Sequence, residues 1–341
     1  MLNNFKLQKV IILISGERMI ISRAPTRISF AGGGTDIESY FNQYGGCVVS
    51  TTITPSIITT VERISNNIVK VDLNYKNGIE SEKNLDLINC IIKNFENVKG
   101  ININVVSEVP QKSGLGGSSS AAVSLIGAFY RLIGKKIDKK EIAKLAYEIE
   151  RFKLGIKGGY QDQYASAFGG LNFIEFSKNE IKVNPLKIKK SYLEELEKNL
   201  ILIHILKRVD NIVHTKIENY IKRKETDKIE ALNKTKELAI EIKDALEKGD
   251  LNHFGELLGK AWEQKKISHP NISTPYINEL YDLAKKHGAI GGKLCGAGGF
   301  MFLYCQPDRK EFVLKELSNF GAVPMEFKFD NKGLVVLGDL D

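Results

Sequence analysis

The sequence has few cysteines and contains no long apolar run. The four cysteines are Cys47, Cys90, Cys295 and Cys305, and none of them forms a C-x-x-C pair. This argues against a structural zinc site and indicates a reducing compartment, so we expect a cytoplasmic protein. The five histidines show no H-E-x-x-H spacing, the pattern of zinc proteases. No apolar run approaches the roughly 20 residues of a transmembrane helix, so no membrane partner is expected.

The composition is that of a globular protein with a modest excess of positive charge. The 341 residues are enough for two domains with their own cores. The formal net charge is +8, which suits an anionic small molecule as ligand. Lys and Arg are spread through Lys/Glu-rich segments rather than gathered in one aromatic-lined patch, so a nucleic-acid partner is not expected.

The most informative stretch is rich in glycine and serine. It lies between residues 101–106, which have the pattern of a strand, and residues 121–132, which have the pattern of a helix. Glycines let the backbone approach an anion, and the first amides of a helix point outward at the positive end of its dipole. Serines there can cap the helix or hold a metal ion. A Ser-capped helix after a flexible loop is the alternative, but phosphate binding is favoured. The candidate residues are Pro110, Ser113, Gly114, Leu115, Gly116, Gly117, Ser118, Ser119 and Ser120.

Three common phosphate-binding motifs are absent from the sequence. No Lys follows these glycines, as the P-loop requires. The dinucleotide fingerprint needs a third small residue and then an acid at the end of the next strand, whereas serines and a second helix follow here. The H-R-D and D-F-G motifs of protein kinases are also missing.

The segment 109–119 resembles the second motif of the GHMP kinases, the superfamily of galactokinase, homoserine kinase, mevalonate kinase and phosphomevalonate kinase. That motif usually reads P-x-x-S-G-L-G-S-S, and this chain has Gly117 where the first of those serines is usual. Two further motifs extend the resemblance over nearly the whole chain. Within the superfamily, the closest likeness is to the branch of heptose 7-phosphate kinases and fucokinases.

A second glycine-rich segment follows the strand predicted over residues 20–30. Residues 22–36 resemble the first motif of the family, which keeps a triple Gly followed by Thr-Asp in the heptose kinase branch. The resemblance implies that this motif lines the sugar side of the site. Asp36 would accept a hydrogen bond from a hydroxyl, and Arg27 would contact phosphate or the catalytic centre. The residues alone leave open an Asx turn or helix cap for Asp36 and a structural ion pair for Arg27. The candidate substrate residues are Arg27, Gly33, Gly34, Thr35 and Asp36.

Asp162 is the candidate for the catalytic base. A helix capped by Asp138 is predicted to run through the apolar positions up to residue 152, and Gly158-Gly159 follow it. In the GHMP pattern the acid after such a glycine pair is the catalytic Asp. Position alone leaves open a helix cap for Asp162.

The resemblance also implies a magnesium site, formed by Ser118 and Glu150. Glu150 precedes Asp162 by one residue more than the equivalent spacing in mevalonate kinases, so Glu148 is the second candidate. Ser119 is likewise the second candidate for Ser118. Both hydroxyl and carboxylate oxygens suit this hard ion. A solvated helix face is the alternative for Glu150.

A third glycine-rich segment, residues 291–299, resembles the third motif of the family. That motif lies between strands and closes over the phosphate region, which implies a contact from Gly298. Lys293 is interpreted as part of the family pattern rather than as a catalyst.

A substrate that already carries a phosphate needs a second group of cations, for which Arg and Lys are suited. After the strand predicted over residues 200–206, the resembled branch has a Thr-Gly-x-x-Arg segment, of which this chain keeps only the arginine, Arg208. The candidates for this anion site are Arg23, Arg27, Arg208 and Lys265.

The fold implied by the resemblance is α+β with two domains. Residues 19–190 would form the ATP-binding domain, which resembles domain 2 of ribosomal protein S5 and contains a left-handed β-α-β crossover. Residues 191–341 would form a ferredoxin-like domain. Residues 1–18 precede the first motif and carry no recognisable chemistry. We expect them to be a disordered or non-native extension, with translation starting at Met19.

The function implied by the resemblance is that of an ATP-dependent and Mg²⁺-dependent sugar kinase. The substrate would be D-glycero-D-manno-heptose 7-phosphate, phosphorylated at the anomeric O1 hydroxyl to the 1,7-bisphosphate, in the biosynthesis of nucleotide-activated heptose for capsule, lipopolysaccharide or S-layer glycans. A homodimer is possible. A fucokinase is the first alternative. The Gly33-Gly34-Thr35-Asp36 element argues against a kinase for mevalonate or homoserine, and Ser118, Glu150 and Asp162 argue against a non-catalytic relative.

Overall fold

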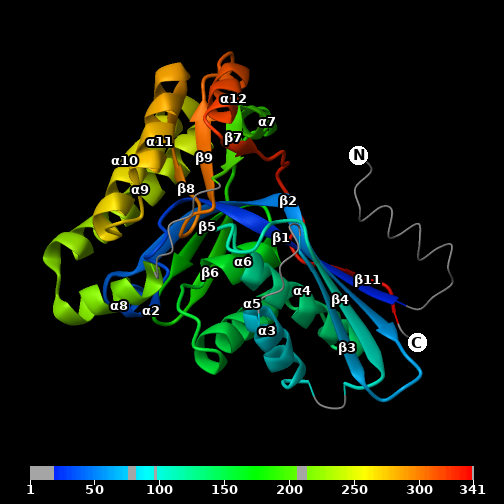
Figure 1. Ribbon diagram of the computed structural model, residues 1–341. Coiled ribbons are helices and arrows are strands. Elements are labelled where there is room, and N and C mark those ends of the chain that lie inside the picture. Colours follow the sequence, from blue (N-terminus) through cyan, green and yellow to red (C-terminus); the bar gives the residue numbers. More distant parts are fainter. Residues whose placement is uncertain (1–18, 76–81, 96–97, 206–212, 340–341) are drawn as a thin grey trace.

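Residues 19–75, 82–95, 98–205 and 213–339 are described by the computed structural model (Figure 1). The extension predicted over residues 1–18 and the candidate Arg208 therefore lie outside the described residues. The first half of the chain forms β1 (Met19–Ala31), α2 (Glu38–Tyr44), β2 (Gly46–Arg63), β3 (Val69–Tyr75), α3 (Glu82–Ile92), β4 (Ile101–Ser107), α4 (Gly117–Leu132), α5 (Lys139–Glu148), the π-helix η1 (Ile149–Lys153), α6 (Gln161–Phe168), β5 (Leu171–Phe176) and β6 (Ile181–Pro185).

The first sheet is built around one long strand. β2 is rich in Val, Ile and Thr, which favour extended backbone. One edge of β2 pairs with β1, while its other edge pairs with β5 at its start and with β4 at its end, and β6 adds to β5. β3 and β4 are parallel and are joined through α3. Such a pair requires a crossover connection. The left-handed course of this connection stays a prediction.

Helix α4 lies against this sheet and is flanked by α3, α5 and α6 (Figure 1). It buries an unbroken apolar stretch that includes Leu125, Ile126 and Phe129. The predicted helix is confirmed, but it begins at Gly117, so the serines of the glycine-rich segment form its first turn. The predicted cap of α5 is also confirmed, because the Asp138 side chain accepts a hydrogen bond from the Glu141 amide.

The second half of the chain forms an antiparallel sheet with the strand order β10-β7-β9-β8, covered by helices. Its elements are α7 (Lys190–Asn199), β7 (Leu200–His204), α8 (Val213–Arg223), α9 (Thr226–Lys248), α10 (Leu251–Ser268), α11 (Pro275–His287), β8 (Ala289–Leu294), β9 (Phe300–Cys305), α12 (Lys310–Asn319), β10 (Val323–Pro324) and β11 (Val335–Leu337). The α+β architecture predicted from the sequence is confirmed.

The two halves share a hydrophobic core. Strand β9 sends alternate side chains to two clusters, with Leu303 packing among α11 and α12 and Phe302 packing on the opposite face. On that face Phe30 of β1 lies edge-on to Phe254 of α10, with ring centroids 5.1 Å apart, and to Phe302 at 5.7 Å. The two sheets are therefore held against one another by aromatic side chains from three elements.

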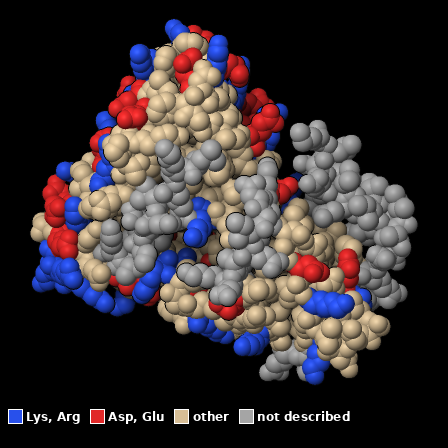
Figure 2. Space-filling model, in the orientation of Figure 1, with Lys and Arg blue, Asp and Glu red and all other residues tan. Residues whose placement is uncertain are grey.

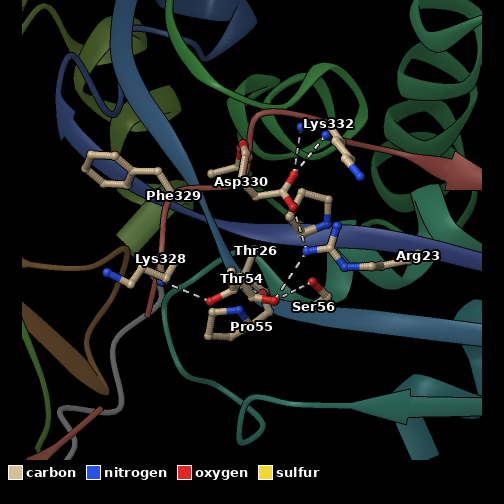
Figure 3. A network of polar contacts seen from close by, with 12 residues as sticks. Arg23, Thr26, Thr54, Pro55, Ser56, Lys328, Phe329, Asp330 and Lys332 are labelled. Carbon is tan, nitrogen blue, oxygen red and sulfur yellow. Dashed lines mark hydrogen bonds and ion pairs between the residues drawn. The ribbon is translucent and has the colours of Figure 1, made fainter. Parts of the chain in front are cut away.

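The chain returns to the first sheet at its end, because β11 pairs with β1. The segment before β11 is fixed by Asp330 (Figure 3). Its carboxylate lies 2.7 Å from the Arg23 guanidinium and accepts hydrogen bonds from the backbone amides of Lys332 and Gly333. Arg23, a candidate for the substrate's phosphate, is thus engaged in joining the two ends of the described chain. The domain boundary at residue 190 stays a prediction. β11 follows this boundary in the sequence but pairs with β1 in the first sheet.

Charges of both signs are interleaved on the face seen in Figure 2, and Lys and Arg gather at the end of the molecule where α8 lies. The last turn of α8 contains Lys222 and Arg223. None of the described helices is both long enough and apolar enough to cross a membrane.

We expect Asp330→Ala to lower the free energy of unfolding by about 3 kcal/mol, because it leaves the Arg23 guanidinium, which is only 12% exposed, without its carboxylate partner. The two backbone amides also lose their acceptor. Thermal and urea denaturation would measure the loss. Asp308→Ala is the control, since the Asp308 side chain is 79% exposed and lies 3.9 Å from Arg309. Equal stability of the two variants would contradict a structural role for Asp330.

Candidate functional site

The glycine-rich loop, residues 109–116, ends in an uncapped helix terminus and is called the phosphate loop below after its predicted role. Gly116 has φ 79° and is the N-cap of α4, where no side chain caps the helix. The first backbone amides of α4 have no intrahelical partner and lie at the positive end of the helix dipole, as an anion-binding site requires. Ser120 has a different role in the structure. Its hydroxyl donates to the carbonyls of Pro25 and Gly116, which anchors α4 to β1.

The third glycine-rich segment packs directly on this loop. A Cβ on Gly114 would lie 2.2 Å from the Cys295 carbonyl oxygen, and a Cβ on Gly299 would lie 2.9 Å from the Ser113 carbonyl oxygen. Both positions also have positive φ, so only glycine fits. Gly298 lies in the same turn, where a Cβ would meet no atom within 4 Å. The predicted approach of the third motif to the phosphate loop is thus seen in the structure.

Asp162 lies in the first turn of α6 and faces the phosphate loop. Its Oδ1 accepts hydrogen bonds from Arg27 Nε at 2.8 Å and from Arg27 Nη2 at 2.7 Å. Arg27 Nη1 donates to the Gly114 carbonyl at 2.7 Å. Asp162 Oδ2 has no hydrogen bond to a described residue and lies 3.4 Å from the position that a Cβ on Gly116 would occupy. One carboxylate oxygen is therefore held by Arg27, and the other is directed at the loop.

Glu150 lies beside the first turn of α4 because the helix that carries it widens into the π-helix η1. A π turn contains one residue more than an α turn, which changes the direction of the side chains that follow. Glu150 Oε1 accepts a hydrogen bond from Ser118 at 3.0 Å, and Oε2 accepts one from Ser119 at 2.7 Å. Glu148, by contrast, has a 40% exposed side chain beside Lys144.

The residues around Glu150 fit a magnesium ion. Glu150 is 1% exposed and forms no ion pair with a described residue. The donors are one carboxylate and two hydroxyls, which are hard oxygen ligands. Across the described ranges there is no cluster of three or more His, Cys, Asp or Glu that could hold a metal ion by itself. An ion at Glu150 would therefore take its remaining ligands from phosphate oxygens and water, as Mg²⁺ commonly does.

Gln163 is a residue of this site that the sequence analysis missed. Its Nε2 donates to Glu150 Oε2 at 2.6 Å and to Ser119 Oγ at 3.0 Å. It lies one position after Asp162, on a different side of the first turn of α6. Its signal is full burial of a glutamine, and burial is not visible in the sequence.

The first-motif residues form a tight turn against α6. Asp36 Oδ1 accepts from the Gly34 amide at 2.9 Å, and Oδ2 accepts from the Gln161 amide at 3.1 Å. Asp36 therefore caps α6 rather than α2, and its burial raises the pKa of this carboxyl. The Thr35 hydroxyl donates to the carbonyls of Gly32 and Cys47. Its side chain thus stabilises the turn that carries Gly33.

Two lysines, the buried Lys293 and the half-buried Lys265, lie near Arg27 and have different surroundings. Lys265 Nζ donates to the carbonyls of Leu294 at 2.9 Å and Gly296 at 2.6 Å, so it fixes the third glycine-rich segment. Lys293 is 5% exposed and has no ion pair or side-chain hydrogen bond to any described residue. Burial, together with the charge of Arg27, lowers the pKa of Lys293 to about 8. A buried ammonium beside another cation is suited to an anionic ligand. From the sequence, Lys293 was interpreted only as part of the family pattern.

A surface depression with a volume of about 460 Å³ lies elsewhere. It is lined by residues of β2, β5, β6 and α9, including Cys47, Phe173 and Lys236. Of the site residues described above, only Cys47 lines this depression. Cys47 contacts the site through its backbone carbonyl, which accepts a hydrogen bond from Thr35. The candidate site is therefore defined by its side-chain contacts, at the junction of β1, α4, α6 and the 291–299 segment.

Comparisons with known proteins agree with this arrangement. The family model for the GHMP kinases N terminal domain matches residues 86–170, and that for GHMP kinases C terminal matches residues 242–323. A D-glycero-alpha-D-manno-heptose 7-phosphate kinase from Campylobacter jejuni is 37% identical to this chain, over 93% of this chain and 98% of its own length. A mevalonate kinase from Pyrococcus horikoshii is 26% identical, over 95% of this chain and 94% of its own.

Solved structures show the same fold. A D-glycero-D-manno-heptose 1-phosphate kinase from Bacteroides thetaiotaomicron superimposes with a TM-score of 0.76 at 33% identity, covering 93% of this chain and 98% of its own. The mevalonate kinase of Methanococcus jannaschii has a TM-score of 0.71 at 24% identity, covering 92% of this chain and 99% of its own, and supports the fold alone.

We expect Lys293→Met to stabilise the ligand-free protein at pH 7, because it removes a buried charge without a partner. Since the pKa of Lys293 is about 8 in the folded protein and its ordinary value is 10.5, the unfolded chain binds this proton more tightly. Wild-type stability should therefore rise between pH 8 and 10.5, relative to the variant, by about 3 kcal/mol. Melting temperatures across this range, with the exposed Lys260→Met as control, would measure the difference. Parallel pH profiles of Lys293→Met and wild type would contradict this account.

Proposed function

The chain belongs to the GHMP kinase family, and from this premise we propose that it transfers the γ-phosphoryl group of ATP to the anomeric O1 hydroxyl of D-glycero-D-manno-heptose 7-phosphate. Membership follows from the 37% identical relative and the two family models. The protein is a phosphotransferase that acts on an alcohol group of a sugar. The particular sugar, the acceptor hydroxyl and a role in nucleotide-activated heptose biosynthesis belong to the proposal.

The observation that carries the proposal is the position of Asp162 over the phosphate loop. The substrate hydroxyl oxygen attacks the γ-phosphorus, the bond from that phosphorus to the β–γ bridging oxygen breaks, and ADP leaves. The hydroxyl proton passes to Asp162 Oδ2, the carboxylate oxygen that faces Gly116. Arg27 holds the other oxygen, so the carboxylate keeps its orientation while the proton moves. Phosphoryl transfer needs mainly this positioning and charge neutralisation.

The nucleotide's phosphates would bind the uncapped amides at the start of α4, next to the loop residues Ser113 to Ser119. Ser118 and Glu150 would hold Mg²⁺, with Ser119 and Gln163 positioning the Glu150 carboxylate. When bound, the ion neutralises charge on the transferred phosphoryl group. Lys293 would supply a further positive charge near Arg27.

The names of two relatives support a heptose phosphate as the substrate but differ in the position of its phosphate. The Campylobacter jejuni relative is named for the 7-phosphate, and the Bacteroides thetaiotaomicron structure is named for a heptose 1-phosphate kinase. We propose the 7-phosphate as substrate and O1 as acceptor. Of the cations first considered for the substrate's phosphate, Arg23, Arg27 and Lys265 are engaged within the protein, and Arg208 lies outside the described residues. Lys293, which was not among them, has no ion pair within the described residues and is the cation we add to the proposal.

We expect Asp162→Asn to lower kcat by about 10²-fold or more, because the amide keeps the shape of the side chain but cannot accept the proton. The KM for ATP should change little, since Asp162 is not part of the phosphate loop. Steady-state kinetics would test this. An Asp162→Asn enzyme with near-normal turnover would rule out Asp162 as the base.

Glu150→Gln should raise the Mg²⁺ concentration needed for half-maximal activity, because it removes the charge of the only carboxylate beside Ser118 among the described residues. Glu148→Gln is the matched control, two positions away on the solvent side of the same helix. Titrations of Mg²⁺ at fixed ATP would compare the two. A shift for Glu148→Gln alone would mean that the metal site is assigned to the wrong residue.

The substrate itself is tested by kinetics on D-glycero-D-manno-heptose 7-phosphate, the 1-phosphate, free heptose, mannose, fucose and mevalonate. We expect the 7-phosphate to have the highest kcat/KM and the product to carry its new phosphate on O1, as phosphorus NMR would show. If the 1-phosphate were preferred, the acceptor would be a different hydroxyl. If free fucose were preferred, a fucokinase would replace the proposed function.

A further inference from the structure

A second polar feature lies beside Asp162, and the phosphoryl transfer described above does not use it. Ser29 and Gln161 are buried, with exposed fractions of 6% and 8%. Ser29 Oγ and Gln161 Oε1 have no hydrogen-bond partner in the described part of the chain. A buried polar atom without a partner costs free energy, so two of them next to one another indicate that something outside the chain satisfies them.

The two side chains are placed beside the reacting groups by the elements that carry them. Ser29 follows Arg27 by two positions on β1, and side chains at this spacing point to the same face of a strand. Gln161 directly precedes Asp162 in the first turn of α6. The pair formed by Ser29 and Gln161 therefore lies alongside the pair formed by Arg27 and Asp162.

Gly33 leaves a space between Ser29 and Gln161. A Cβ on Gly33 would lie 3.5 Å from Gln161 Nε2 and 3.9 Å from Ser29 Oγ, and these are the only atoms within 4 Å among the described residues. Both distances are ordinary van der Waals contacts, and Gly33 does not have positive φ. Glycine is thus not required here by backbone conformation or by crowding. The missing methyl group leaves room for a ligand atom between two polar side chains.

The chemistry of this space favours an uncharged hydroxyl group. Gln161 lines the space with Nε2, which can donate, and its Oε1 in the same amide group needs a donor. Ser29 can donate and accept. Asp36 lies against the same turn, with its Oδ2 on the Gln161 amide, and Asp162 is the next residue. A phosphate placed here would meet both carboxylates, whereas a hydroxyl can donate to Gln161 and exchange a hydrogen bond with Ser29.

We propose that Ser29, Gly33 and Gln161 form a pocket for a sugar hydroxyl other than the one that receives the phosphoryl group. This rests on the proposed function only in that the substrate is a polyhydroxyl compound. The pocket orients the sugar against Asp162 and selects for a hydroxyl at one position. Ser50, the cross-strand neighbour of Ser29, also has a hydroxyl without a partner in the described chain, so the polar surface continues onto β2.

Three variants test the pocket. Gly33→Ala fills the space, Gln161→Met removes the amide at similar length, and Ser29→Ala removes the hydroxyl. Each is expected to raise the KM for the sugar about 10-fold, the effect of one or two hydrogen bonds, with an unchanged KM for ATP. Melting temperatures should stay equal or rise, because no hydrogen bond within the protein is lost. Ser22→Ala is the matched control, since Ser22 has an equally unpartnered buried hydroxyl near the other end of β1.

Monodeoxy analogues of the substrate identify the hydroxyl. With the wild-type enzyme, one analogue should have a kcat/KM about 10-fold lower than the full substrate. With Gln161→Met, the same analogue and the full substrate should have equal kcat/KM, because the variant already lacks the interaction that the analogue removes. The series uses whichever sugar the wild-type enzyme phosphorylates best, so an error in the assigned sugar is detected separately. The proposal is overturned if all three variants have the wild-type KM for the sugar, which is the result expected for a pocket that holds only water. It is also overturned if every analogue shows the same loss of kcat/KM with the wild-type enzyme and with Gln161→Met.

Discussion

The candidate site depends on the buried guanidinium of Arg27. It binds the Asp162 carboxylate through two nitrogens and the Gly114 carbonyl through the third, while the Arg27 backbone amide donates to the Leu115 carbonyl. One residue of β1 thus links α6, which carries the proposed base, to the loop that is proposed to bind the phosphates. Arginine suits this task because its planar fork offers several donors in fixed directions, which a lysine cannot reproduce.

Positive and negative charges are separated around this centre. Glu150 is buried without a cation on the side of the first turn of α4, and Lys293 is buried without an anion near Arg27. Burial lowers the pKa of Lys293, so its positive charge is unfavourable in the ligand-free protein. A metal ion with a nucleotide would bring positive charge to Glu150 and phosphate to Lys293. In the proposed function the protein thus gives up stability at Lys293, a position where it would bind its substrate.

Close approach between distant segments depends on a small number of glycines. Gly114 and Gly299 let the phosphate loop and the 291–299 segment touch through their backbones. Lys265 then holds the second segment from α10 by its carbonyls. The end of the chain adds a further tie, because Asp330 fixes the segment before β11 against Arg23. The site is therefore assembled from parts of both sheets, which the aromatic contacts of Phe30 keep in place.

Local pattern in the sequence was sufficient for the strands and helices around the glycine-rich loop, because backbone conformation and helix capping depend on neighbouring residues. The glycine-rich motifs were sufficient for the family and, through it, for the α+β class. Only the tertiary structure showed that Glu150, and not Glu148, lies against Ser118, since the π turn changes the side-chain direction at a point where the sequence shows a continuous helix. Gln163, Lys293, Ser29 and Gln161 likewise became candidates only from burial and from the identity of their neighbours. Those neighbours come from strands and helices far apart in the chain, and no local spacing encodes which of them will meet.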